Sequence, residues 1–160
     1  VQGRTLTYVG DGNNTCHELM IGAARLGVEI VVATPAGYEP NPLIVKSTAR
    51  DAQKYGTPPA VLVRDPAEAM NGAQAVYTDV WTSMGQEAQE TSRRAAFAAY
   101  SVDAALMARA RKDAVFMHCL PAHRGEEVTD EVMDGPQSVV FQQAGNRLHV
   151  QKAAMTLLMA

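Results

Sequence analysis

The fold is decided by residues 5–34, which read TLTYVGDGNNTCHELMIGAARLGVEIVVAT. The two ends of this stretch, Thr5–Val9 and Glu29–Ala33, are short β-branched runs typical of buried strands. Between them, Gly27 stands where a helix C-cap belongs, and apolar residues recur at helical spacing at Cys16, Leu19, Met20, Ala23 and Ala24. A strand, a helix and a second strand in this order predict two parallel strands joined by a right-handed crossover.

The same alternation continues along the rest of the chain. Further strands are expected at Ala60–Val63, Ala75–Thr78, Val115–His118 and Ser138–Phe141. The last helix is expected to bury one face, which carries Val150, Ala153, Ala154, Leu157 and Leu158. We therefore predict an α/β fold of the Rossmann-like, doubly wound type, in which helices cover both faces of a parallel sheet in three α/β/α layers.

Composition and charge limit the class of protein. The 160 residues, 47% hydrophobic and 19% charged, suit a single compact domain. A formal net charge of -3, from 14 basic and 17 acidic side chains, argues against binding to a nucleic-acid backbone. No apolar run approaches the roughly 18 residues that a membrane span needs. The two cysteines fit a reducing, cytoplasmic compartment, and the first residue, Val1, suggests a piece of a longer protein.

Three polar, glycine-containing corners follow predicted strands and are candidates for a site. They are residues 10–14 (GDGNN), residues 79–85 (DVWTSMG) and residues 119–125 (CLPAHRG). Ligands of open α/β sheets bind outside the carboxyl ends of the strands. Because all three corners lie at that edge, we expect their side chains to meet in one site.

The first corner has three interpretations. Gly10 and Gly12 resemble part of a dinucleotide-binding loop, but the third glycine position holds Thr15, and the second strand ends without the acid that binds a ribose. Asn13 or Asn14 is a good helix cap. The paired amides beside a helix N-terminus also suit a carboxylate ligand.

The second corner carries an acid and a hydroxyl. Asp79 suits either a loop cap or a counter-ion for an ammonium group. Ser83 adds a hydroxyl and Gly85 permits close approach to the backbone, although Ser83 with Gln86 also fits a capping box. The polar stretch Asp79–Ser92 is long, which is more typical of a functional loop than of a connector.

The third corner places a cysteine and an X-Pro bond at the end of a strand. The bond between Leu120 and the following proline is a candidate cis bond. Cys119 is a candidate reactive thiol, for which His118 is a poor base because it points to the opposite side of the strand. Zinc binding by Cys16 and His17 together with this pair is disfavoured, because neither pair has the spacing of a structural site. We expect no metal.

Arg147 is expected at the opening of the last helix, in line with its buried face. There the side chain either extends over the edge of the core or points into the crevice. Only the second arrangement uses the fixed fork of donors that a guanidinium carries.

Together these motifs resemble the ornithine carbamoyltransferases. The resemblance rests on GDGNN at 10–14, Asp79 with SMG at 83–85, HCLP at 118–121 and GNR at 145–147. It runs from about Leu6 to the end of the chain and covers only the C-terminal, ornithine-binding domain of that family. The Ser-Thr-Arg-Thr phosphate loop and the His-Pro-x-Gln segment of the other domain are absent, and residues 47–50 are a superficial echo on a predicted helix. We therefore expect residues 1–160 to form a single ornithine-binding domain without the N-terminal, carbamoyl phosphate-binding one.

The resemblance implies an activity and an amino-acid pocket. In the family, the side-chain nitrogen of ornithine attacks the carbonyl of carbamoyl phosphate and gives citrulline and phosphate. Asn14 would bind the ornithine carboxylate and Asp79 its α-ammonium group. Ser83 and Met84 would complete this pocket, and the loop after Asp79 would close over the substrates.

The resemblance also implies a site for the carbamoyl group. Cys119 would lie beside the attacking amine and assist proton transfer. The carbonyl of Leu120 would bind the carbamoyl NH2, and Arg147 would bind the carbonyl oxygen, where negative charge develops. We expect a cation near Cys119 to lower the pKa of its thiol. No metal or organic cofactor is implied.

The expected partners are L-ornithine, carbamoyl phosphate, the missing N-terminal domain and further copies in a trimer-based homo-oligomer. We expect this domain to be inactive alone. Within the same family, the alternative is a carbamoyltransferase for another amine, such as putrescine or an acylated ornithine. Outside the family, the alternatives are a nucleotide-binding Rossmann module and a non-catalytic amino-acid-binding domain.

Overall fold

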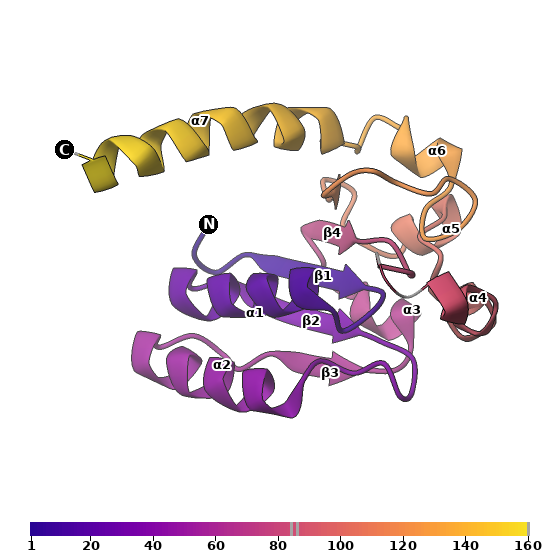
Figure 1. The fold of residues 1–160 in the computed structure, drawn as a ribbon, viewed down its shortest axis with the longest axis horizontal. Coiled ribbons are helices and arrows are strands. Elements are labelled where there is room, and N and C mark those ends of the chain that lie inside the picture. The colour runs from indigo at the N-terminus through magenta and orange to yellow at the C-terminus, as the bar shows by residue number, and fades with distance from the viewer. Residues whose placement is uncertain (84, 86, 160) are drawn as a thin grey trace.

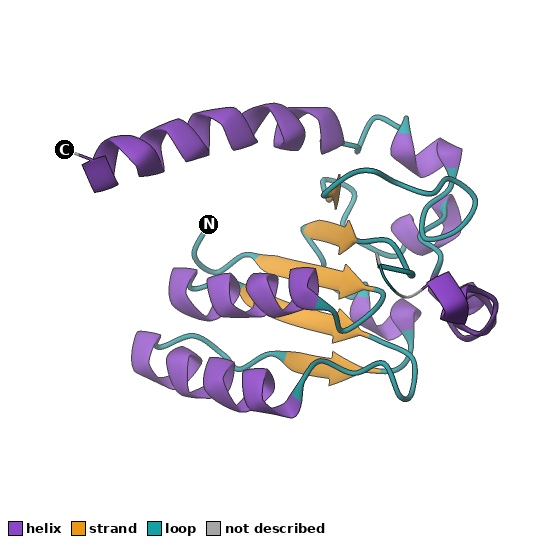
Figure 2. Ribbon diagram, viewed as in Figure 1, coloured by secondary structure: helices purple, strands orange, loops and turns teal. Residues whose placement is uncertain are grey.

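The computed structural model describes residues 1–83, 85 and 87–159. Five parallel strands form one sheet in the order β3-β2-β1-β4-β5 (Figure 2). The strands are β1 (Thr5–Val9), β2 (Glu29–Ala33), β3 (Val61–Val63), β4 (Ala75–Thr78) and β5 (Val115–His118). This order confirms the doubly wound sheet, and it places the point where the strand order reverses between β1 and β4.

Helices cover both faces of the sheet, which gives the expected three layers. On one face, α1 (Asn14–Leu26) and α2 (Pro42–Tyr55) lie side by side (Figure 1). The other face is covered by α3 (Pro66–Ala69), α4 (Glu90–Phe97), η2 (Ala98–Tyr100), α5 (Ala104–Met107) and α6 (Asp130–Met133), and the short η1 (Glu87–Gln89) precedes α4. The last helix is α7 (Val140–Met159).

Neighbouring residues of β1 belong to two apolar layers, one on each face of the sheet. Tyr8 packs with Cys16 and Met20 of α1, while Val9 packs with Phe97 of α4, and all five side chains are fully buried. Successive side chains of a strand point to opposite faces, so a central strand that is covered on both faces is apolar on both. The core therefore fixes the carboxyl edge of the sheet from both sides.

Local sequence sets both ends of α1, which begins at one of the two candidate asparagine caps and ends at the expected glycine. Asn13 is the N-cap, and its side-chain oxygen accepts a hydrogen bond from the backbone N–H of Cys16 at 3.1 Å. Gly27 is the C-cap, with a φ of 73° in the left-handed region that favours glycine, and its N–H donates to the carbonyl of Ala23. The helix thus begins directly at the corner that follows β1.

The strand predicted at residues 138–141 is wrong. Ser138 forms only an isolated parallel bridge with Phe116 of β5, and α7 already begins at Val140. Val140 is fully buried as the first residue of this helix. A short apolar run bounded by polar residues has the same periodicity in a strand and in a buried helix end, and here it forms the helix end.

The buried face predicted for the last helix is also wrong within this chain. Val150, Leu157 and Leu158 are 67%, 82% and 86% exposed, and Ala153 and Ala154 are exposed as well. Figure 1 shows the C-terminal half of α7 running past the sheet, away from the other helices. Apolar spacing predicts that a helix face will be covered, but no described residue covers this one. None of the helices in the described part of the chain, α7 included, is both long and apolar enough to span a membrane.

Candidate active site

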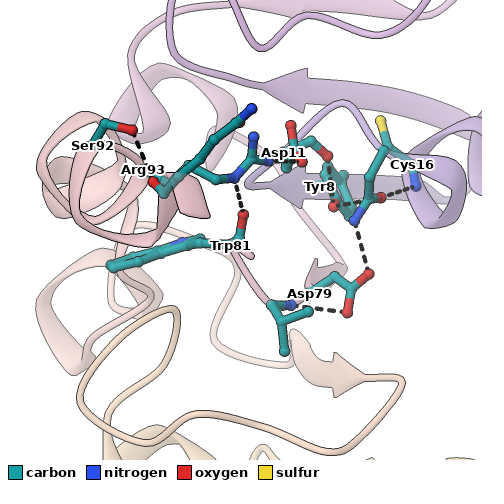
Figure 3. A network of polar contacts seen from close by, with 10 residues as sticks. Tyr8, Asp11, Cys16, Asp79, Trp81, Ser92 and Arg93 are labelled. Carbon is teal, nitrogen blue, oxygen red and sulfur yellow. Dashed lines mark hydrogen bonds and ion pairs between the residues drawn. The ribbon is translucent and has the colours of Figure 1, made fainter. Parts of the chain in front are cut away.

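The carboxyl ends of β1, β4 and β5 are neighbours in the sheet, so the three polar corners meet as predicted. Asp79, directly after β4, accepts a hydrogen bond from Asn13 after β1, with 3.0 Å between Nδ2 and Oδ2. It accepts another from Cys119 after β5, with 2.9 Å between Sγ and Oδ1. Figure 3 shows the Asp79 carboxylate turned toward the corner after β1. Asp79 therefore joins the three corners and is the centre of the candidate site.

The Asp79 side chain is buried, yet its environment favours the charged form. Burial raises its pKa, but hydrogen bonds outweigh burial and hold the pKa below its ordinary value. The donors are the Cys119 thiol, the Thr15 side chain, the Asn13 amide and the backbone N–H of Val80. A buried carboxylate stabilised in this way suits a cationic ligand group.

Cys119 is half-buried and its thiol is protonated at neutral pH. Burial, the hydrogen bond to Asp79 and the charge of Asp79 raise the pKa of Cys119 to about 12. The expected lowering by a nearby cation is therefore wrong, because the charged group in contact with the thiol is a carboxylate, which disfavours the thiolate. In this geometry Cys119 is a hydrogen-bond donor.

His118 does not act as a base for Cys119, as predicted. It is fully buried, and its Nδ1 accepts a hydrogen bond from the backbone N–H of Leu120 at 2.8 Å. Its Nε2 lies 3.3 Å from Oε1 of Glu127, which is also fully buried and accepts a hydrogen bond from the backbone N–H of His123 at 2.6 Å. The peptide bond after Leu120 is cis, as predicted. Glu127 was missed because a glutamate in a polar loop is usually solvated.

The expected ornithine ligands lie at the same edge of the sheet. Asn14 and Ser83 border one depression of about 570 Å³, together with Asn13. Ser83 also borders a second depression of about 680 Å³, whose far side is formed by the loop after β5. Met84 lies outside the described residues. The substrate roles of Asn14, Ser83 and Met84 stay predictions.

A buried ion pair that was not predicted lies beside this site. Arg93 of α4 pairs with Asp11 after β1 and donates Nε–H to the carbonyl of Trp81 after β4 at 2.6 Å (Figure 3). The guanidinium carbon also lies 4.8 Å from the ring centre of Tyr38, in the loop after β2. Arg93 therefore contacts three of the loops at the carboxyl edge. The one signal in the sequence was Phe97, four residues later, which marks this side of α4 as buried.

Arg147 is not placed beside Asp79. It is the eighth residue of α7 rather than its opening residue, and it is exposed. One turn earlier, Gln143 contacts the sheet: it accepts a hydrogen bond from the backbone N–H of His118 and donates one to the hydroxyl of Tyr77, each at 3.1 Å. Residues four apart share a helix face, so Arg147 continues this face beyond the sheet. Its role toward the carbamoyl group stays a prediction.

The glycine at position 12 is required by packing within the protein. A Cβ added to Gly12 would lie 2.3 Å from the backbone nitrogen of Pro40, and its N–H donates to the carbonyl of Tyr38 at 2.9 Å. In a dinucleotide-binding loop, the second glycine lets the backbone approach the pyrophosphate. Here the loop before α2 covers that position, which disfavours the nucleotide-binding alternative.

Within the described residues, the four side chains weighed as zinc ligands form no cluster. A different group gathers there, in which ligand atoms of His123, Glu126 and Glu127 all lie within 4.8 Å of one another. Arg94 forms an ion pair with Glu126. A guanidinium thus already balances one of the two carboxylates that a cation would use.

The sequence is similar to one family over nearly its whole length. Residues 2–158 match the family described as "Aspartate/ornithine carbamoyltransferase, Asp/Orn binding domain". The chain is 60% identical over 158 residues to the ornithine carbamoyltransferase of Symbiobacterium thermophilum, covering 99% of this chain and 51% of that protein. It is 54% identical over 159 residues to that of Thermococcus kodakarensis, covering 99% and 50%. The chain thus spans about half the length of the curated relatives it matches.

Solved structures agree with this match. The ornithine carbamoyltransferase of Pyrococcus furiosus has a TM-score of 0.92 and 51% identity, over 98% of this chain and 50% of that one. The ornithine transcarbamoylase of Giardia lamblia has a TM-score of 0.89 and 36% identity, over 96% and 50%. The fold and the corner motifs therefore point to the same group of proteins.

Proposed function

Because the chain belongs to the aspartate/ornithine carbamoyltransferase family, as its Asp/Orn binding domain, we propose that it binds L-ornithine for carbamoyl transfer. In the intact protein, the side-chain amine of ornithine attacks carbamoyl phosphate and gives L-citrulline and phosphate. The names of the relatives support this reaction. The observation that carries it is the buried, charged Asp79 carboxylate, held between the corners after β1 and β5.

The proposed pocket binds the amino-acid end of ornithine at the carboxyl ends of β1 and β4. Asp79 faces the α-ammonium group, to which a carboxylate offers charge-assisted hydrogen bonds. Asn14, in the first turn of α1, faces the α-carboxylate, which the positive end of the helix also favours. Ser83 and Met84 complete the pocket. A further carboxylate on the substrate, as in aspartate, would meet the like charge of Asp79.

The proposed chemistry holds a neutral amine against the carbamoyl carbon and stabilises the oxygen on which charge develops. The side-chain amine lies beside Cys119, whose raised pKa keeps it a thiol that donates a hydrogen bond, so the proton that the amine loses on attack leaves with the departing phosphate and not on Cys119. The carbonyl of Leu120 binds the carbamoyl NH2, and the guanidinium of Arg147 binds the carbamoyl oxygen. These steps use no metal or organic cofactor.

The remainder of the protein, in this proposal, is the domain that binds the phosphate group of carbamoyl phosphate. The chain spans about half of its relatives, and the apolar side chains of Val150, Leu157 and Leu158 are exposed. Packing this half of α7 against the other domain would bury them and place Arg147 between the two halves. We therefore expect no turnover from residues 1–160 alone.

We further propose a trimer-based homo-oligomer in the cytoplasm for the intact protein. Cys16 and Cys119 are both free thiols, which fits a reducing compartment. Sedimentation of the intact protein tests the oligomeric state.

A carbamoyl-transfer assay on the intact protein with ornithine, putrescine and N-acetylornithine tests the function. Ornithine should be the best substrate, and Asp79→Ala should lower its kcat/KM roughly a hundredfold, because a buried charge pair loses one partner. Putrescine, which lacks the α-ammonium and the carboxylate, should lose far less. Asp113→Ala is the control, because this exposed acid forms an ion pair with Arg111 and does not belong to the proposed site. Preference of the wild-type protein for another amine would contradict the proposal.

A further inference from the structure

We propose that Asn13 is a positioning residue of the site, which holds the Asp79 carboxylate in the orientation that binds the ornithine ammonium group. This inference rests on the proposed function. It assigns the two asparagines after β1 different tasks, because Asn14 is exposed at the depression whereas Asn13 is half-buried against Asp79.

The cap of α1 fixes which way the Asn13 amide faces. Its Oδ1 accepts the hydrogen bond from the backbone N–H of Cys16 at 3.1 Å and lies 3.4 Å from the hydroxyl of Tyr8. A rotated amide would set its NH2 group against the N–H of Cys16, and two donors cannot pair. With Oδ1 committed to the helix, Nδ2 must point to Asp79, whose Oδ2 is 3.0 Å away.

This arrangement ties the two oxygens of Asp79 to different parts of the fold. Oδ2 is held by Asn13 at the start of α1. Oδ1 is held by the thiol of Cys119 after β5 and by the backbone N–H of Val80 at 2.8 Å. A carboxylate has about four lone-pair sites, and with the Thr15 side chain these donors match all four. They fix the plane of the carboxylate, and a ligand ammonium group shares an oxygen with one of them or displaces it. The donor from Asn13 also helps to keep Asp79 ionised.

The substitution Asn13→Asp separates positioning from capping. Aspartate caps a helix as well as asparagine does, but it replaces the Nδ2 donor with an oxygen that repels Asp79. The matched control is Asn41→Asp, because Asn41 caps α2 by accepting from the backbone N–H of Leu43 at 2.8 Å. Both variants therefore keep a capping side chain, and only the first disturbs the site.

In the intact enzyme, Asn13→Asp should raise KM for ornithine at least about tenfold, the value of a hydrogen bond to a charged group. KM for carbamoyl phosphate should stay within the range of the control. The acidic limb of the kcat/KM profile should move to higher pH, because two facing carboxylates share a proton. Asn13→Asp with the KM for ornithine of the wild type would overturn the inference.

A double-variant cycle tests the contact without relying on turnover. Combining Asn13→Asp with Asp79→Asn exchanges the amide and the carboxylate, so the hydrogen bond can form again in the opposite sense. The urea midpoint of the double variant should regain at least half of the loss caused by Asn13→Asp, while ornithine binding stays lost. If the wild-type protein is active but the shifts in urea midpoint of the two single variants simply add in the double variant, the role of Asn13 is overturned and the proposed function stands. A wild-type protein that forms no citrulline would instead overturn the proposed function.

Discussion

Two regions of the domain carry residues expected to act on the substrates, and the chain completes only one of them. At the carboxyl edge, Asp79 is held by hydrogen bonds from the corners after β1 and β5. Along α7, Arg147 and the apolar side chains that follow it are exposed. The first region is preorganised by contacts inside this domain. The second is left exposed by the described residues of this chain.

A comparison of two helices shows why one kind of sequence signal has two outcomes. α1 and α7 both repeat apolar residues at helical spacing. α1 buries Cys16 and Met20 against the sheet, whereas α7 exposes Leu157 and Leu158. Spacing therefore indicates that a helix face will be covered, but not that the cover belongs to the same domain.

The largest expected effect is a slow alkylation of Cys119, in the preorganised region at the carboxyl edge. The pKa of Cys119 is raised from 9.0 to about 12, which lowers its thiolate fraction at neutral pH about a thousandfold. Alkylation by iodoacetamide should be slower than that of an unperturbed cysteine by this order. Because a raised pKa keeps the thiol protonated, the rate should rise about tenfold per pH unit until the pKa is reached.

The measurement follows the Cys119 peptide by mass spectrometry, which separates it from the buried Cys16. Asp79→Asn should speed the reaction, because it removes the charge that disfavours the thiolate. An ordinary alkylation rate at neutral pH in the wild-type protein would show that the thiol is not held as described.

The second expected effect concerns the region that this chain leaves open. Arg147→Met in the intact protein should lower kcat by about 10²–10³-fold, the effect of removing one group that stabilises a developing oxyanion. Ornithine binding, measured by calorimetry, should stay within about twofold. Lys152→Met is the control, because it removes an exposed cation from the same helix. A normal kcat for Arg147→Met would leave α7 without a part in the site.

The third expected effect compares two adjacent arginines of α4. Arg93→Met leaves Asp11 buried without its partner and should lower the free energy of unfolding by about 3 kcal/mol or more. Arg94→Met removes solvent-accessible ion pairs with Glu90 and the half-buried Glu126, and it should cost less than about 1 kcal/mol. Urea unfolding measures both.

The loss at Arg93 should also depend on pH in a defined sense. Burial raises the pKa of Asp11, and the charge of Arg93 opposes this rise. Without Arg93, Asp11 protonates more readily, and a neutral acid is less costly to bury. The loss of stability should therefore shrink as the pH falls, and a loss that is equal at acidic and neutral pH would contradict the assignment to Asp11.

Local patterns predicted most of the fold, including the five strands of the sheet and the capped helix α1. They also predicted that Asp79 and Cys119 meet, because both follow adjacent parallel strands. They missed Arg93, whose partner Asp11 is 82 residues away, and they misplaced Arg147. Such contacts depend on how whole elements pack, which no local spacing encodes.

The smallest expected effect is a change in stability, and it tests whether the exposed apolar face of α7 is buried in the intact protein. Leu158 is 86% exposed, so Leu158→Ala should change the stability of residues 1–160, produced alone, by no more than about 0.5 kcal/mol. In the intact protein the same change should cost about 2 kcal/mol, the lower end for a buried leucine. Met20→Ala in α1 is the matched comparison. It should lower the stability of residues 1–160 and of the intact protein alike by at least about 2 kcal/mol, because Met20 is already fully buried within this chain. Equal effects of Leu158→Ala in the two proteins would mean that nothing covers this face, and Arg147 would then have no route to the site through α7.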